Sequence, residues 1–326
     1  MDSINIKRSI FFLTVVGVVV VAISVYAFNV SQNVDQVEDV VETPVEIPVE
    51  PEEVEEIEAE EVREIEVDLL IEEPISILLL GVDRGEFGET GQGLADSIIV
   101  VTINPEEETM KMISIPRDTR TEIVGMDFDD KINHAYAFGG IEMIVNTAQS
   151  LLDIPIDYYV RVDMVGLQAL VEAVGGIEVE NDFDFTFEGV HFPLGTVYLN
   201  GADALSFSRM RYEDPRGDFG RQERQRLVIE ALINELMSLS NIAQFTSILD
   251  TAREYVETDI VFDDVAAMLF GGYRGALENI EQLQLLVGEG QTINGIYYQI
   301  LSDEEIANAS AILRTHLGLD VDDSYE

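Results

Sequence analysis

A cluster of arginines in a strongly acidic chain limits the folds that this sequence can adopt. The chain has 64 acidic and 18 basic residues, and its formal net charge is -46. Arginine suits carboxylates and phosphates, because its planar guanidinium donates paired hydrogen bonds. Any anion that binds the segment from Ser208 to Arg226 must overcome the repulsion of this acidic chain, and the arginines gathered there provide the opposing charge. That segment contains Arg209, Arg211, Arg216, Arg221, Arg224 and Arg226.

A helix is expected within this segment. A proline and two glycines interrupt regular structure around Asp218, and aspartate is a typical helix N-cap, so the pattern predicts a helix from Phe219 to Leu239. Its apolar residues recur at helical spacing, and Arg221 and Gln225 project onto the same core-facing side. A buried, unpaired charge is costly. Arg221 therefore needs either a carboxylate such as Asp214 or Asp218 or a bound phosphate, and the cluster as a whole favours a phosphate site.

Composition excludes several classes of function. The chain has no cysteine, so disulfides, a thiol nucleophile and cysteine-based zinc sites are impossible. Only three histidines are present, which disfavours a multi-histidine metal site. The acidic excess argues against nucleic acid as a partner, because such binding needs a broad basic surface. Our hypothesis for the acidity is adaptation to high salt or to alkaline surroundings.

The N-terminal part of the sequence predicts a membrane anchor and a spacer. Residues 1–8 end in two basic residues, and residues 9–28 form an uncharged, mostly apolar run of bilayer-spanning length. We favour a retained anchor over a cleaved signal peptide, since no clear cleavage site follows. The basic flank places residues 1–8 in the cytoplasm and the remainder outside the cell membrane. Residues 29–74 are dominated by Glu and Val, which predicts a disordered acidic linker.

The folded domain is expected to occupy residues 75–326. The apolar run Ile75–Val82 predicts a buried strand, Ser97–Ile103 a second strand and Thr109–Ile115 a third. If the first and third strands run parallel, the polar residues after them meet at one rim of the sheet, as in open α/β sheets that bind ligands. Those polar residues are Asp83, Arg84, Arg117 and Arg120, with Asp96 beginning the strand between them.

The rest of the domain reads as alternating helices and strands. Residues 183–198 predict an aromatic hairpin or flap. Helices are expected at Ile141–Leu152, Met164–Val174, Ala202–Met210, Ile242–Tyr255, Val265–Leu277 and Glu304–Leu317, and strands at Tyr158–Val162, Ile177–Glu180, Leu283–Val287 and Tyr297–Leu301.

The candidate site combines two aspartates with several basic residues. Asp83 and Asp96 suit a hard cation such as Mg²⁺ or Mn²⁺, which takes one or two carboxylates together with substrate phosphate oxygens. Arginines around a metal-bound diphosphate are typical of phosphoryl transfer. No nucleotide-binding Gly-Lys-Ser/Thr loop is present. An internal ion-pair network remains the alternative for each residue. The basic members are Arg84, Arg117, Lys131, Arg209, Arg211 and Arg221.

Four ordered motifs resemble the LytR-CpsA-Psr family. They read Ile-Leu-Leu-Leu-Gly-Val-Asp-Arg at 77–84, Ile-Ser-Ile-Pro-Arg-Asp-Thr at 113–119, Lys-Ile-Asn-His-Ala-Tyr at 131–136 and the arginine-rich stretch at 209–225. The resemblance implies an αβα sandwich with a mixed central sheet and an apolar tunnel for a lipid tail. It also implies transfer of teichoic acids, capsules or related polymers from polyprenyl diphosphate onto muramic acid of peptidoglycan, outside the membrane of Gram-positive bacteria.

The resemblance also implies roles for individual residues. Asp83 and Asp96 match the metal-binding aspartates of the family, and Gln225 matches a polar position after the last arginine. The diphosphate-binding arginines fall on Arg84, Arg117, Arg209, Arg211 and Arg221, and we add Lys131. As groups that act on the reacting centre we single out Arg117, Asp118 and Arg221, with Asp96 or Asp118 as the possible base.

One position departs from the family pattern and keeps other functions open. The family commonly reads Arg-Ser-Asp-Thr around its second aspartate, while residues 94–97 of this chain read Leu-Ala-Asp-Ser, so Leu94 replaces the arginine. The leading hypothesis is a membrane-anchored glycopolymer–peptidoglycan phosphotransferase. A non-catalytic protein that binds lipid-linked glycan, or a polyprenyl-diphosphate hydrolase that uses water on the same site, are the alternatives.

Overall fold

A computed structural model describes residues 73–83, 93–238, 242–261, 265, 268–269 and 271–320. The predicted anchor at 9–28, nearly all of the predicted linker and the candidate Arg84 lie outside these residues. Within the described part of the chain, none of the helices is long and apolar enough to cross a membrane.

The centre of the domain is a mixed six-stranded sheet. Its strand order is β11-β6-β1-β2-β3-β12. β2 is antiparallel to both β1 and β3, while β6 is parallel to β1 and β12 is parallel to β3. The strands are β1 (Ile75–Asp83), β2 (Leu94–Asn104), β3 (Thr109–Ser114), β6 (Tyr158–Asp163), β11 (Val256–Thr258) and β12 (Ile280–Leu283).

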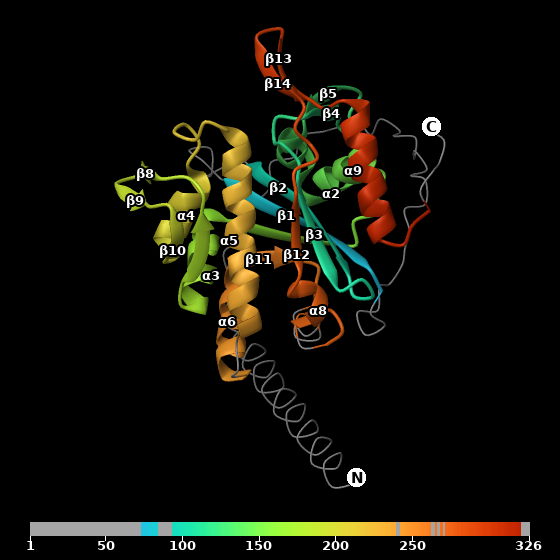
Figure 1. The fold of residues 1–326 in the computed structure, drawn as a ribbon. Helices are drawn as coiled ribbons and strands as arrows, with labels where there is room; N and C mark the ends of the chain where they lie inside the picture. Colours follow the sequence, from blue (N-terminus) through green and yellow to red (C-terminus); the bar gives the residue numbers. More distant parts are fainter. Residues whose placement is uncertain are drawn as a thin grey trace, which may run out of the picture. The chain divides into compact units, whose positions relative to one another are not determined.

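Helices cover both faces of this sheet (Figure 1). Alternate residues of β1 and β2 point to opposite faces. On one face, Leu78 and Val100 pack with α2 (Ile132–Leu152) and α9 (Asp303–His316). On the other, Ile77 and Ile99 pack with α5 (Asp218–Ser238), α6 (Ile242–Tyr255) and α8 (Arg274–Leu277). The sequence-based expectation of an α/β fold around a mixed sheet is confirmed.

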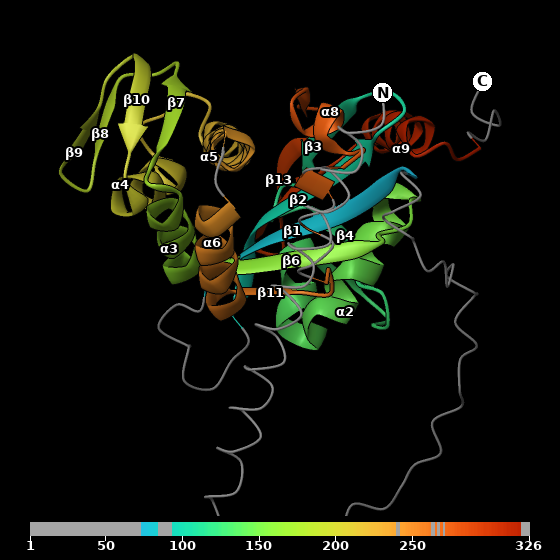
Figure 2. The same ribbon diagram turned by 90° about the horizontal axis from the view of Figure 1, so that it is seen from below.

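A third core lies beside the sheet and is separate from its two faces. Figure 2 shows α3 and α4 with the small strands β7 to β10 gathered on one side of α5 and α6. Apolar residues of α5 and phenylalanines of the small strands form this core. Its elements are α3 (Met164–Val174), α4 (Gly201–Arg209), β7 (Ile177–Asn181), β8 (Phe185–Phe187), β9 (Val190–Phe192) and β10 (Gly195–Leu199). The short pairs β4 (Arg120–Glu122) with β5 (Asp129–Lys131) and β13 (Glu289–Ile293) with β14 (Ile296–Ile300) complete the fold.

Several expected elements differ from the structure. The helix expected at 141–152 begins at Ile132 and contains a kink, where Gly140 has φ of 67°. The expected helix 265–277 was wrong at 271–273, because α8 begins only at Arg274. The expected strand 283–287 was also wrong: β12 ends at Leu283, and pairing with β3 sets its register. Short apolar runs do not distinguish these possibilities without their partners.

Candidate active site

The polar residues that follow β1 and β3 lie at one rim of the central sheet. Because β2 is antiparallel to both strands, β1 and β3 run in the same direction. Asp83 is the last residue of β1, and Arg117 comes shortly after β3 ends at Ser114. Asp96 lies near the start of β2, beside the end of β1. The directions of the strands therefore confirm that Asp83, Asp96 and Arg117 lie at the same rim of the sheet.

A β-bulge sets the position of Asp96. In the β1–β2 pairing, Gly81 lies opposite Ser97 and Val82 lies opposite Ala95, so Asp96 is an extra residue without a strand partner. Bulges re-aim the side chain that they carry. The Oδ1 atom of Asp96 accepts a hydrogen bond from Nη1 of Arg117 at 2.7 Å, and its backbone carbonyl accepts one from Nη1 of Arg221 at 2.9 Å. The bulge thus places Asp96 in contact with both Arg117 and Arg221.

Asp218 is the second anionic centre of this site. Its carboxylate accepts hydrogen bonds from Nε and Nη2 of Arg221 at 2.9 and 3.1 Å and lies 3.4 Å from Nε of Arg211. Gln222 also donates to it, at 3.0 Å. Burial acts to raise the pKa of Asp218, but the hydrogen bonds and charges of Arg221, Gln222 and Arg117 hold it below its ordinary value. Of the two partners considered for Arg221, the internal carboxylate is thus present, and it is Asp218.

Asp118 and Lys131 form a third pair in the same region. Oδ1 of Asp118 lies 2.7 Å from Nζ of Lys131, and Oδ2 lies 3.9 Å from Nε of Arg117. β5 delivers Lys131, and the loop after β3 delivers Arg117 and Asp118. Burial acts to lower the pKa of Arg117, but the neighbouring carboxylates, Asp96 above all, raise it. Arg117 therefore stays a cation in contact with two of the candidate acidic residues.

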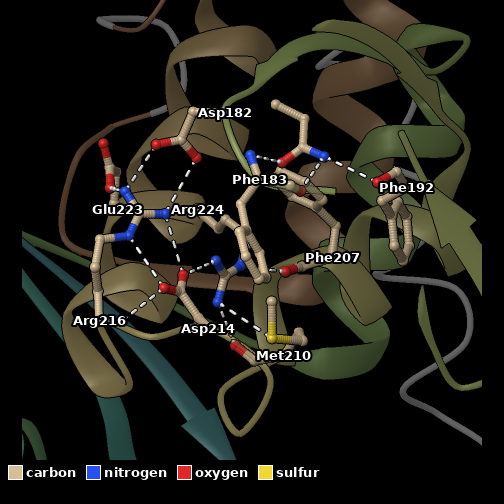
Figure 3. A network of polar contacts seen from close by, with 10 residues as sticks. Asp182, Phe183, Phe192, Phe207, Met210, Asp214, Arg216, Glu223 and Arg224 are labelled. Atoms are coloured by element: carbon tan, nitrogen blue, oxygen red, sulfur yellow. Dashed lines mark hydrogen bonds and ion pairs between the residues drawn. The ribbon is translucent and has the colours of Figure 1, made fainter. Parts of the chain in front are cut away.

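The remaining arginines of the cluster have structural partners. Figure 3 shows Asp214 between Arg216 and Arg224, with Asp182 and Glu223 on the far side of Arg216. The Asp214 side chain is 0% exposed and lies 2.6 Å from Nη1 of Arg224. Arg224 also donates to the carbonyls of Phe207 and Met210, at 3.1 and 2.5 Å. The Asp214–Arg224 pair therefore fixes the backbone at Met210. The candidate residues Arg209 and Arg211 lie on either side of it.

The structure therefore divides the six arginines of the cluster into two groups. Arg226 lies on the buried side of α5, where it donates to Oγ of Ser114 in β3 at 2.6 Å and to Oε1 of Gln282 in β12 at 3.3 Å. Arg224 and Arg226 are buried and bonded inside the protein, so the interpretation of the whole cluster as a phosphate site was wrong for these two members. Arg216 is bonded to Asp214 but is 36% exposed and lines a polar pocket beside Arg211, so it stays a candidate together with Arg209, Arg211 and Arg221.

Two other candidates lie further from this network. Arg209 contacts Oε1 of Glu188 at 3.2 Å, and its side chain is 43% exposed. Gln225 is half-buried, one turn of α5 after Arg221. The helix begins at Asp218, one residue earlier than expected, and therefore aligns Arg221, Gln222 and Gln225 along its first two turns.

A polar pocket of about 230 Å³ opens beside these groups. Asp118, Arg211 and Asp218 line it, and its other wall consists of Tyr297 and Gln299 from the β13–β14 hairpin. Ligand pockets commonly measure about 300–1,000 Å³, so this one suits a head group and not a whole lipid-linked substrate. Sequence reasoning missed Tyr297 and Gln299, because no motif marks them, and it overlooked Gln222, which follows Arg221 within the motif at 209–225. It named Asp218 only as a cap and an ion-pair partner.

The donor chemistry at the rim fits a hard cation held by two carboxylates. Asp83 and Asp96 lie near each other in the β1–β2 pairing and would supply oxygen ligands, as Mg²⁺ sites with substrate phosphates do. Within the described residues, no group of three or more His, Cys, Asp or Glu side chains is arranged to hold a metal. A cation here would therefore depend on these two aspartates and on oxygens of the substrate.

The fold and this rim define an α/β protein in which arginines and carboxylates gather beside two strand-borne aspartates. The chain matches the model of the LytR_cpsA_psr family over residues 45–315 and belongs to that family. The match extends beyond the four motifs on both sides.

Relatives and solved structures agree with this assignment. The polyisoprenyl-teichoic acid–peptidoglycan teichoic acid transferase TagU of Halalkalibacterium halodurans is 50% identical over 253 residues, covering 77% of this chain and 82% of that protein. The crystal structure of Bacillus subtilis TagU matches with a TM-score of 0.61 and 39% identity, covering 75% of this chain and 97% of that one. TagT bound to LIIa-WTA matches with a TM-score of 0.68 and 30% identity, covering 79% and 95%.

Proposed function

We propose that this chain is a phosphotransferase that attaches a polyprenyl-diphosphate-linked glycopolymer, such as a teichoic acid, to muramic acid of peptidoglycan. The observation that carries this proposal is the convergence of Arg117, Arg211 and Arg221 around Asp96 and Asp218. The relative from Halalkalibacterium halodurans, at 50% identity, bears the name of this activity.

The reaction needs no oxidation or reduction. The acceptor hydroxyl oxygen bonds to the phosphorus that carries the glycopolymer, while the bond from that phosphorus to the bridging oxygen breaks. Polyprenyl phosphate leaves with the electron pair, and the hydroxyl proton passes to a carboxylate. We assign this carboxylate to Asp118, whose Oδ1 is held by Lys131 at 2.7 Å and whose Oδ2, 3.9 Å from Nε of Arg117, accepts the proton.

The arginines stabilise the charge that develops on the phosphoryl oxygens. A guanidinium has five N–H donors, so Arg117 can hold Asp96 and a phosphate oxygen at the same time. Arg221 is fixed by three hydrogen bonds to Asp218 and Asp96, and Arg211 is the more exposed partner, at 33%. Such pre-oriented donors cost no reorganisation when the reaction occurs.

Asp83 and Asp96 are the residues that would hold Mg²⁺ or Mn²⁺. When bound there, the cation would neutralise charge on the diphosphate oxygens. The hydrogen bond from Arg117 orients Asp96 for this role, and the bulge in β2 brings it beside the end of β1.

Product analysis with a lipid-linked glycopolymer donor and a glycan acceptor tests the proposal. The full chain is expected to release polyprenyl phosphate only when the acceptor is present and to form a glycan phosphodiester. Arg117→Ala should lower the rate about 100-fold or more, as the loss of one oriented donor does elsewhere. Release of polyprenyl phosphate without an acceptor would indicate the hydrolase instead.

Leu94 supports one alternative, a protein that binds lipid-linked glycan without turnover. Leu94 lies opposite Asp83 in the β1–β2 pairing and is 37% exposed, so the rim lacks a cation at this point. Replacing it by Arg should tighten donor binding. A donor that binds but stays intact with the acceptor present would favour this alternative.

We further propose that residues 9–28 anchor the chain in the cell membrane with the domain outside. The uncharged length of this run and the basic residues before it support the proposal. The mature protein should keep its original N-terminus and fractionate with membranes. A mature N-terminus downstream of residue 28 would identify a signal peptide.

A further inference from the structure

The β13–β14 hairpin forms one wall of the polar pocket, although it is remote in sequence from every motif of the site. The opposite wall includes Asp118 and Arg211. The hairpin is joined to that wall through the backbone, because the N–H of Gln299 donates to the carbonyl of Asp118 at 2.8 Å. Tyr298 adds a contact from its hydroxyl to Asp130 at 3.3 Å. The hairpin therefore has a fixed place beside Asp118.

Tyr297 is held at this wall with much of its ring exposed. Its hydroxyl donates to Oε1 of Gln299 at 2.7 Å, and Nε2 of Gln299 donates to the carbonyl of Val287 at 2.6 Å. The ring lies over Gly290, where an added Cβ would be 2.9 Å from Cε2 of the tyrosine. Tyr297 nevertheless stays 46% exposed. Its orientation is thus set by neighbours that leave a large part of the ring open at the pocket.

An exposed aromatic ring beside charged groups is typical of sugar-binding sites. The C–H face of a pyranose ring packs on an aromatic ring, while its hydroxyl groups bond to carboxylates and guanidinium groups. The pocket offers Tyr297 for the first contact, and Asp118 and Arg211 for the second.

We infer that this pocket is the acceptor subsite and that Tyr297 packs against a pyranose ring of the acceptor glycan. The inference rests on the proposed function. Only the acceptor hydroxyl loses a proton in that reaction, and Asp118, the carboxylate assigned to take it, lines this pocket. A sugar on Tyr297 would therefore present its hydroxyl between Asp118 and the diphosphate-binding arginines.

Three variants of the full chain test this inference. Tyr297→Ala removes the ring, Tyr297→Phe keeps the ring but loses the bond to Gln299, and Ile296→Ala is the matched control. Ile296 is the adjacent residue of β14, is 49% exposed, and points to the other face of the strand. Transfer is measured against acceptor concentration, donor binding is measured separately, and binding of a soluble N-acetylglucosamine–N-acetylmuramic acid oligomer is followed by NMR.

Tyr297→Ala is expected to raise the acceptor KM and weaken oligomer binding about threefold to tenfold, as the loss of an aromatic contact does. Donor affinity should stay within about twofold, and Tyr297→Phe and Ile296→Ala should resemble the parent.

Unchanged oligomer binding in Tyr297→Ala overturns the inference. An equal loss in donor affinity also overturns it, because the ring would then belong to the donor site. Absence of transfer by the parent chain, with Tyr297-dependent oligomer binding, refutes the proposed function alone.

Discussion

Replacing Asp214 by Asn should destabilise the fold strongly, although Asp214 lies outside the proposed chemistry. Its carboxylate is 0% exposed and accepts hydrogen bonds from the backbone and side chain of Arg216 and from Nη1 of Arg224. The substitution keeps the size of the side chain but removes its charge. Arg224, whose side chain is 2% exposed, would then be a buried cation without its partner.

The size of the effect follows from the burial of this pair. Loss of one partner of a buried ion pair typically costs about 3–5 kcal/mol. The pKa of Asp214 gives a second value for this free energy. Burial alone would raise the pKa, but the bonds from Arg216 and Arg224 lower it from 3.8 to about 2. At about 1.4 kcal/mol per pKa unit, this lowering corresponds to roughly 2.5 kcal/mol. We therefore expect a loss of about 3 kcal/mol at pH 7.

Urea unfolding of the full chain in mild detergent, followed by circular dichroism, measures this loss. Asp182→Asn is the matched control, because Asp182 also contacts Arg216 but its side chain is 58% exposed. An exposed pair contributes at most about 1 kcal/mol. Adding Arg224→Met to Asp214→Asn should recover part of the stability, since the unpaired cation is then removed.

The pH dependence provides a second check. A carboxyl whose pKa is lowered by folding stabilises the protein fully above its unfolded pKa of about 4 and loses this contribution as the pH falls through about 2. The difference between parent and Asp214→Asn should therefore be constant near neutrality and shrink between about pH 4 and pH 2. A loss no larger than that of Asp182→Asn at pH 7 would refute the reasoning.

Three further outcomes are expected. Asp96→Asn should abolish turnover while circular dichroism stays unchanged, and activity of that variant in the presence of a chelator would exclude the metal role. Arg211→Ala should weaken binding of a polyprenyl diphosphate about tenfold to 100-fold at fixed salt, and more than Arg211→Lys, which keeps the charge but loses the paired donors; unchanged affinity would make the arginine structural. Burial, with Lys111 nearby, lowers the pKa of His316 to about 4, so protonation favours unfolding and stability should fall by about 3 kcal/mol from pH 7 to pH 4. His316→Gln should remove this dependence in urea titrations, and a parent chain equally stable at both pH values would contradict it.

Local patterns were enough to place the first three strands and the rim of the sheet. Apolar runs end at Asp83 and just before Arg117, and the turn between the second and third strands makes the first and third run the same way. These strand inferences succeeded because strand direction depends on neighbouring residues along the chain. The family motifs assigned phosphate contacts to particular arginines, and this assignment stays a prediction.

The tertiary structure alone decided which arginines are structural and what faces the site. Asp214 pairs with Arg216 and Arg224, and charge and spacing in the sequence do not identify these two arginines as its partners. Tyr297 lies far from every motif in the sequence, and the contacts of its neighbours Gln299 with Asp118 and Tyr298 with Asp130 bring the hairpin to the pocket. Charge and composition predict that a cation needs an anion, but the identity of that anion depends on which segments pack together.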